Sequence, residues 1–260
     1  MEIKATITQV EGLQLVGTAR KTSIVLDTTP KVHGKDAGMT PKPLTVVSIL
    51  TELLHRIWKE CGKAFKVYTD YTLATEHPKR FVKIHYYFIA PEECKESITK
   101  HVDRNLSPIL KSLKEDIEIS YEFTDILPEI EEEKIFSIQT CDGYSIHFLR
   151  NNVITGDVDG KWGMTPYEIF LLSLGGCTGM DSISILIKMK QDLKRYRMEI
   201  LGEVDDNTGV FTKLHVKYIA EGNVDEAKLK KSIDLSRERY CGVQASIREN
   251  IPVTYEYEVR

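Results

Sequence analysis

The feature that most constrains this chain is an internal repeat. The segment Gly34-Lys-Asp-Ala-Gly-Met-Thr-Pro41 recurs, one residue shorter, as Gly160-Lys-Trp-Gly-Met-Thr-Pro166. Other matches follow in the same order, and the ends also match, as Ile117-Glu-Ile-Ser-Tyr-Glu-Phe123 and Val253-Thr-Tyr-Glu-Tyr-Glu-Val259. Two copies are too few for a solenoid and more often form a single-chain version of a two-fold dimer. We therefore expect two copies of one α+β unit, in residues 1–123 and 136–260, joined by a linker over 124–135.

The same order of elements is expected in both copies. Strands come first, then a long helix, two further strands, a second helix and a last strand. The expected strands are Lys4–Val10, Leu13–Val16, Ser23–Leu26, Met198–Val204, Phe211–Ile219 and Val253–Val259. The second helix of the second copy is expected to begin near Asn223, which would be its N-cap with Glu226 as partner.

The long helix of the second copy has a strong start signal. Thr165 can cap the helix, Pro166 suits its first position, and Glu168 can close a capping box. The residues that follow are apolar on nearly every side, which is typical of a buried central helix. Gly175 and Gly176 stand before a cysteine in this helix, and glycines in a helix interior indicate close approach of another helix or a small substrate.

Composition excludes some functions. The chain has 260 residues, 42% of them hydrophobic, with a net charge of −4 and no basic stripe of the kind that nucleic-acid binders show. No window is expected to reach the ~18 apolar residues of a membrane span, and the start alternates like a strand rather than a signal peptide. We therefore expect a cytoplasmic protein that binds neither nucleic acid nor membrane.

Three of the five cysteines carry no recognisable pattern. Cys61, Cys94 and Cys141 lack CxxC spacing, so neither a zinc knuckle, nor another metal site, nor a disulfide scaffold is expected. We expect all three to be dispensable. Cys94 follows a predicted helix start and is expected to be exposed.

The other two cysteines occur only in the second copy. Aligning the copies puts Glu52 opposite Cys177 and Ser112 opposite Cys241. Cys241 precedes a short predicted helix, whose free N–H groups and dipole favour a thiolate. A pair kept together is what a shared chemical role predicts, although drift of one copy gives the same pattern and Cys177 alone reads equally well as a buried structural cysteine.

These residues resemble a known family. The segment 163–181, which contains Gly-Gly-Cys-Thr, is similar to the first-cysteine helix of the OsmC/Ohr superfamily, the osmotically inducible protein C and organic hydroperoxide resistance proteins. The segment 234–243 resembles its second-cysteine segment. The resemblance is strong over about 136–260, whereas residues 1–123 look like a degenerate copy.

The resemblance implies a fold and a chemistry. It implies an intramolecular pseudo-dimer with sheets wrapped around central helices, and cysteine peroxidase activity without metal or cofactor. Cys177 would attack the peroxide and become a sulfenic acid, and Cys241 would resolve it to a disulfide that an external dithiol reduces.

In the family an arginine and a glutamate assist at a subunit interface. Arg20, opposite Arg150 in the alignment, could reach Cys177 from the first copy, with Arg150 as the second candidate. Either arginine could instead be an exposed residue at a strand end. Glu168 lies nine residues before Cys177, which is half a turn off and ~13 Å along one helix, so it is a capping residue first and could act only by orienting an arginine. The first copy has Pro43 at this position, which departs from the family pattern.

Three functions remain open from the sequence. The first is a thiol peroxidase for organic hydroperoxides or hydrogen peroxide, the second a thiol enzyme for persulfides or disulfides, and the third a non-catalytic protein that binds a small molecule. A monomer or a homodimer is compatible with each of them.

Overall fold

We describe a computed structural model of the chain, which covers residues 1–126, 134–150 and 152–260. The strands are β1 (Glu2–Glu11), β2 (Gln14–Ala19), β3 (Thr22–Leu26), β4 (Phe65–Leu73), β5 (Phe81–Ile89), β6 (Glu118–Phe123), β7 (Ile135–Gln139), β8 (Ser145–Leu149), β9 (Asn152–Gly156), β10 (Asp192–Val204), β11 (Phe211–Asn223) and β12 (Val253–Val259). The helices are α1 (Pro41–Cys61), α2 (Glu92–His101), α3 (Pro108–Lys111), α4 (Pro166–Lys188), α5 (Glu226–Leu235) and α6 (Gly242–Ala245). Two short 3-10 helices are η1 (Pro30–Val32) and η2 (Arg104–Leu106), and η3 (Ser236–Tyr240) is a single turn of π-helix.

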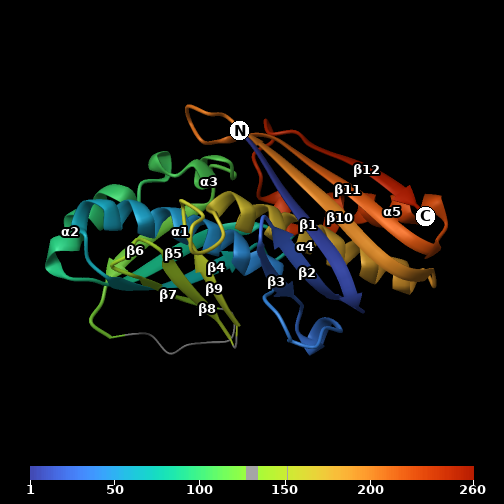
Figure 1. The fold of residues 1–260 in the computed structure, drawn as a ribbon, viewed down its shortest axis with the longest axis horizontal. Coiled ribbons are helices and arrows are strands. Elements are labelled where there is room, and N and C mark those ends of the chain that lie inside the picture. The colour runs from blue at the N-terminus through green and yellow to red at the C-terminus, as the bar shows by residue number, and fades with distance from the viewer. Residues whose placement is uncertain (127–133, 151) are drawn as a thin grey trace.

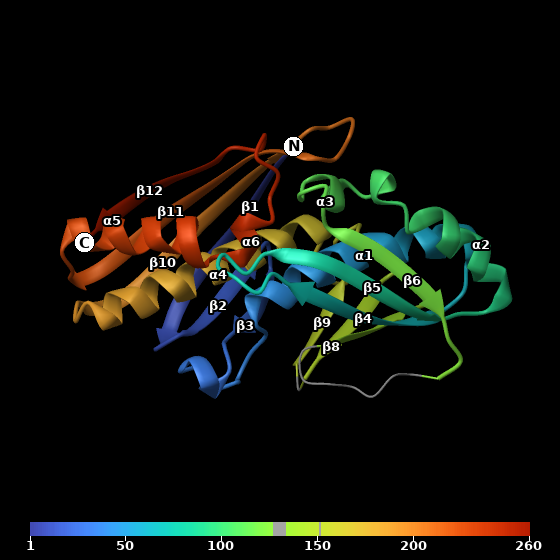
Figure 2. The same ribbon diagram turned by 180° about the vertical axis from the view of Figure 1, so that it is seen from behind.

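The strands form two six-stranded mixed sheets, and each sheet contains strands from both halves of the chain. One has the order β12-β11-β10-β1-β2-β3 and the other β6-β5-β4-β7-β8-β9. The blue strands β1–β3 therefore lie beside the orange and red strands β10–β12 (Figure 1). Seen from behind, β4–β6 lie beside β8 and β9 in the same way (Figure 2).

This exchange makes the chain an internal pseudo-dimer, as predicted. Strand β1 is antiparallel to β10, with Glu2 opposite Glu203, and β7 is antiparallel to β4, with Gln139 opposite Phe65. The fold is α+β, and neither half completes a sheet by itself. The predicted boundaries at 123 and 136 remain predictions, because residues 127–133 of the expected linker lie outside the described residues.

The two long helices meet at the centre, also as predicted. Ser173 of α4 donates a hydrogen bond to the carbonyl of Pro41 at 2.6 Å, and its hydroxyl lies 2.7 Å from that of Thr45. Helix α4 packs on β1, β2 and β10, while α1 packs on β7, β8 and β9. Each helix is thus enclosed by one sheet and the other helix.

The glycines of α4 permit this close packing. A Cβ atom on Gly175 would lie 2.8 Å from Cδ1 of both Ile7 and Ile200, and one on Gly176 would lie 2.9 Å from Cδ1 of Leu26. The elements that approach are therefore the sheet and, through Pro41, helix α1. Contrary to the sequence expectation, α4 is long and apolar enough to cross a membrane, but 83% of that window is buried inside the protein.

Helix α5 begins later than expected. Strand β11 continues to Asn223, and the cap is Asp225, whose side chain accepts a hydrogen bond from the N–H of Lys228 at 2.9 Å. The predicted cap at Asn223 is therefore wrong, because pairing with β10 holds that residue in the sheet.

The expectation of no disulfide is also wrong. Cys61, the last residue of α1, is bonded to Cys94 of α2, with a Cα–Cα distance of 5.1 Å. Cys94 is fully buried rather than exposed. The bond follows from the packing of α2 against α1, which cysteine spacing does not reveal. Cys141 is free and exposed.

Candidate functional site

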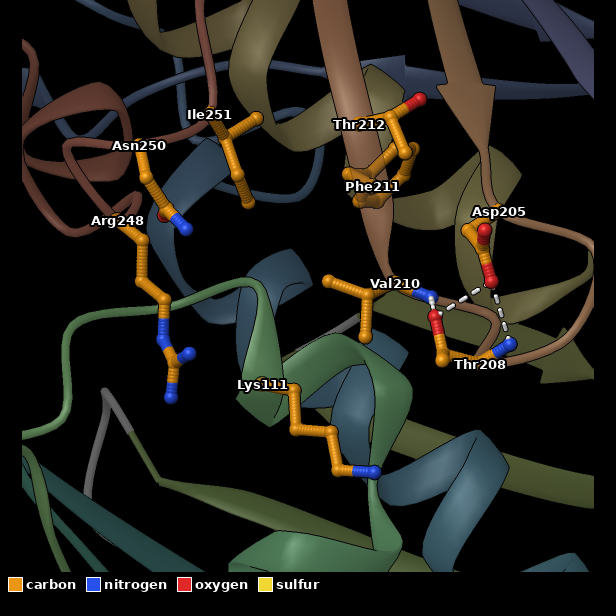
Figure 3. A pocket seen from close by; sticks show the side chains of 9 residues that line it. All are labelled: Lys111, Asp205, Thr208, Val210, Phe211, Thr212, Arg248, Asn250 and Ile251. Atoms are coloured by element: carbon orange, nitrogen blue, oxygen red, sulfur yellow. Dashed lines mark hydrogen bonds between the residues drawn. The ribbon is translucent and has the colours of Figure 1, made fainter.

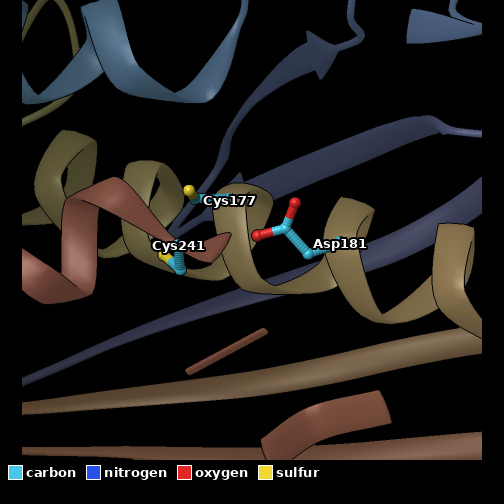
Figure 4. A group of neighbouring side chains, drawn as sticks. All are labelled: Cys177, Asp181 and Cys241. Atoms are coloured by element: carbon cyan, nitrogen blue, oxygen red, sulfur yellow. The ribbon is translucent and has the colours of Figure 1, made fainter. Parts of the chain in front are cut away.

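The two remaining cysteines lie together in the second half of the protein. The sulfurs of Cys177 and Cys241 and a carboxylate oxygen of Asp181 lie within 4.8 Å of one another (Figure 4). Cys177 retains 7% of its surface accessible, whereas Cys241 has none. The sulfurs are not bonded, so this is a dithiol that needs only a local shift to form a disulfide.

Local structure holds Cys241 at this place. The single-turn π-helix η3 ends at Tyr240, and Cys241 follows it as N-cap of α6, as the sequence indicated. Its sulfur accepts a hydrogen bond from the N–H of Gln244 at 3.3 Å. The free N–H groups at the start of α6 therefore point at the thiol pair.

The two thiols differ strongly in acidity. The hydrogen bond from the Cys241 thiol lowers the pKa of Cys177, burial opposes this effect, and Lys42 and the N–H groups of Val243 and Gly242 lower it further, to about 6. Burial raises the pKa of Cys241 well above its ordinary value, and the neighbouring Cys177 adds to the increase. Cys177 is thus the thiolate at neutral pH and Cys241 remains protonated.

A cation that was not expected from the sequence, Lys42, acts on the Cys177 thiol. It is the second residue of α1 and comes from the other half of the chain. A Cβ on Gly242 would lie 3.0 Å from Cε of Lys42, so the lysine stem crosses the residue that follows Cys241. The crossing of α1 and α4 puts this positive charge where it stabilises the Cys177 thiolate.

The expected arginines have other partners. Arg20 binds both carboxylate oxygens of Glu168, with Nη2 2.8 Å from Oε2, and donates to the carbonyls of Gly160 and Gly163. Arg150 pairs with Asp36 at 2.5 Å. Among the hydrogen bonds of the described residues, none from either arginine reaches the Cys177 sulfur, which corrects that expectation.

Glu168 has the structural role that its position predicted. It closes the capping box with Thr165 and at the same time holds Arg20. It lies beside Tyr167, whose pKa burial raises to about 12 with a further contribution from the charge of Glu52. The charge that acts on Cys177 is that of Lys42, whereas Arg20 is occupied by Glu168 and two backbone carbonyls.

The matching place in the first copy is polar and has no thiol, as expected. Glu52 accepts hydrogen bonds from Arg56 at 2.7 Å, from the Ser107 hydroxyl at 3.0 Å and from the N–H of Ile109 at 3.3 Å. Ser107 caps α3 as Cys241 caps α6. A hydrogen-bonded Glu–Ser pair thus stands where the second copy has its two thiols.

This corrects the alignment of Ser112 with Cys241. The Ser112 hydroxyl accepts from the N–H of Phe211 at 3.1 Å, and Ser246 accepts from the N–H of Phe81 at 2.9 Å, so these two serines correspond. The alignment of Ser112 with Cys241 was counted from a three-residue match of Asn105-Leu-Ser107 with Asp234-Leu-Ser236, and this match is coincidental. The better guide is the number of residues from the start of α2 to Ser107, which equals the number from the start of α5 to Cys241.

Two residues of the site left only a weak signal in the sequence. Lys42 stands where the second copy has Tyr167, and Asp181 stands four residues after Cys177, on the same helix face. The first copy has Arg56 at the position of Asp181. The change from Arg56 to Asp181, four residues after the position of Cys177 in each copy, is the sequence signal that points to Asp181.

A hollow of about 370 Å³ opens elsewhere, near the first copy's Ser112 (Figure 3). Its lining residues are Lys111, Asp205, Thr208, Val210, Phe211, Thr212, Arg248, Asn250 and Ile251. Arg248 is already paired with Glu115 at 2.9 Å. None of these lining residues belongs to the thiol site.

Cys177, Asp181 and Cys241 also present the donor types that a metal ion uses. However, a metal cation there would meet the ammonium group of Lys42, whose charge acts on both Cys177 and Asp181. We assign no metal to this cluster and treat it as a thiol site.

Comparison with known proteins gives matches over part of the chain. The family described as OsmC-like protein matches residues 158–256. Protein YhfA of Escherichia coli K12 is 31% identical over 107 residues, which are 39% of this chain and 80% of YhfA. A hypothetical protein from Aquifex aeolicus VF5, of known structure, is 26% identical, with a TM-score of 0.44 over 50% of this chain and 99% of that one. The organic hydroperoxide resistance protein OhrB of Bacillus subtilis is 18% identical, with a TM-score of 0.32 over 47% of this chain and 90% of OhrB.

Proposed function

The chain belongs, through its C-terminal half, to the OsmC-like family, and on this basis we propose that it is a thiol-dependent peroxidase. The observation that supports the proposal most is the pairing of two free thiols within 4.8 Å beside a cation from the other half. A binding protein has no need of such an arrangement. Its substrate would be an organic hydroperoxide or hydrogen peroxide, and its reductant an external dithiol.

The assignment of roles follows from access and charge. Cys177 is the more accessible thiol and the one with the lowered pKa, so it attacks the outer oxygen of the peroxide. Its sulfenic acid would then lie against Cys241, which is fully buried and therefore reacts with this neighbour rather than with solvent oxidants. The disulfide that forms is reduced by thiol exchange with the dithiol.

Peroxide consumption tests this proposal directly. We expect reduced protein to consume tert-butyl hydroperoxide catalytically in the presence of dithiothreitol, with kcat/KM on the order of 10⁴ M⁻¹ s⁻¹ or more. Hydrogen peroxide run in parallel identifies the preferred substrate. The exposed Cys141→Ser variant is the control and should behave as the wild-type protein. Consumption no faster than with dithiothreitol alone would reject the peroxidase and favour a persulfide or disulfide substrate.

A further inference from the structure

Asp181 is an acidic side chain beside both thiols. It lies one helical turn after Cys177, with a carboxylate oxygen within 4.8 Å of each sulfur. Figure 4 shows one of its oxygens turned toward the pair. The Ser236 hydroxyl lies 3.3 Å from Oδ2 and 3.2 Å from the carbonyl oxygen of Thr178, so its one proton is shared between these two acceptors.

The surroundings favour the protonated form of this carboxyl group. Burial raises the pKa of Asp181 well above its ordinary value, and the negative charge of Cys177 raises it further. Lys42, Lys188 and the Ser236 hydroxyl act in the opposite direction. Cys241 and Tyr218 are further titratable groups that interact with Asp181, and its negative charge would raise the pKa of both. A thiolate and a carboxylic acid can thus exist side by side, which is the state that peroxide reduction requires.

We propose that Asp181 carries protons for the thiol pair, first as donor to the leaving oxygen and then as acceptor from Cys241. This role rests on the proposed peroxidase function. It is specific to the second copy, because the first copy has Arg56 at the same place, paired with Glu52.

In the first step the proton is given. The Cys177 thiolate forms a bond to the outer peroxide oxygen, and the O–O bond breaks. The electron pair goes to the inner oxygen, which takes the proton of Asp181 and leaves as the alcohol. Cys177 is now a sulfenic acid and Asp181 a carboxylate, so the charge has moved from sulfur to the acid.

In the second step the proton is received. Cys241 attacks the Cys177 sulfur while its S–H proton passes to Asp181, and the departing hydroxide takes that proton and leaves as water. The Asp181 carboxylate persists until the external dithiol reduces the disulfide. Of the two protons of the dithiol, one then returns to Cys241 and the other to Asp181, which restores the Cys177 thiolate and closes the cycle.

The isosteric Asp181→Asn variant removes the proton and keeps the size. In a single turnover with tert-butyl hydroperoxide, loss of the proton donor slows sulfenic acid formation and loss of the acceptor slows its resolution, so we expect disulfide formation to slow by ~100-fold. The remaining rate should rise about tenfold per pH unit, because hydroxide then replaces the lost base. Wild-type protein should show little change above neutral pH. Asp181→Glu should restore the flat profile, and the exposed Asp192→Asn serves as the matched control.

A second oxidant separates this proposal from the peroxidase. Diamide forms the same disulfide without peroxide, yet Cys241 must still lose its proton. If wild-type protein reacts with diamide and not with peroxide, the peroxidase proposal fails, while slow closure in Asp181→Asn still supports proton transfer to Asp181. A folded Asp181→Asn that forms the disulfide at the wild-type rate, with an unchanged pH profile and with both oxidants, overturns the role of Asp181.

Discussion

Replacing Cys177 by serine should abolish peroxide consumption. A serine hydroxyl is not ionised at neutral pH, so we expect kcat/KM to fall by at least ~1000-fold. Cys177 is almost fully enclosed and its replacement is nearly isosteric, so the melting temperature should change little. The measurement is steady-state peroxide loss with dithiothreitol as reductant.

Cys241→Ser is the informative partner of this variant. Because the serine hydroxyl can replace the hydrogen bond of the Cys241 thiol to Cys177, it should react once with peroxide at close to the wild-type rate. It should then stop, because the sulfenic acid has no thiol to resolve it. Activity that survives in Cys177→Ser would place the chemistry at another residue and contradict the account.

Replacing Lys42 by methionine should shift the pH dependence of the reaction. The hydrogen bond from Cys241 is the largest cause of the low pKa of Cys177 and Lys42 is a smaller one, so loss of the cation is expected to raise that pKa by about 1 unit. In the wild type the rate falls as the pH drops through about 6, because the thiolate is protonated there. In Lys42→Met the same fall should occur about one pH unit higher, which lowers the rate by roughly twofold at pH 7 and roughly fivefold at pH 6 and leaves it unchanged near pH 9.

Arg20→Met makes this test specific. Arg20 is the cation that the family resemblance selects, but its partners are Glu168 and two backbone carbonyls. In Arg20→Met we expect the fall of the rate at low pH to occur at the same pH as in the wild type. The protein should lose stability, because the buried carboxylate of Glu168 loses its ion pair. The rate of peroxide loss, measured from pH 5 to 9, shows whether Lys42 or Arg20 is the cation that lowers the pKa of Cys177. If the pH at which the rate falls changed in Arg20→Met and not in Lys42→Met, the assignment of Lys42 as this cation would be contradicted.

The features that the sequence predicted correctly are those with a local or repeated signal. The Thr165 and Glu168 capping box needs only four neighbouring residues, and the structure contains it. The repeat predicted the pseudo-dimer, because two copies of a half-complete sheet can complete one another. The short helix that was predicted after Cys241 is also present, as α6.

The features that the sequence missed depend on packing between distant segments. Lys42 reaches the thiols only because α1 crosses α4, and nothing near Cys177 in the sequence indicates it. Cys61 and Cys94 meet because α2 packs against α1, although their spacing matches no motif. Ser107 was missed as the counterpart of Cys241 because a chance three-residue match misplaced the alignment.

Thiol counting after one equivalent of peroxide tests the central claim most directly. The protein with its Cys61–Cys94 bond intact has three free cysteines, Cys141, Cys177 and Cys241. After anaerobic treatment with tert-butyl hydroperoxide, alkylation and peptide mass spectrometry, we expect only Cys141 to be alkylated and Cys177 to be linked to Cys241. Three alkylated cysteines after the same treatment would contradict the account.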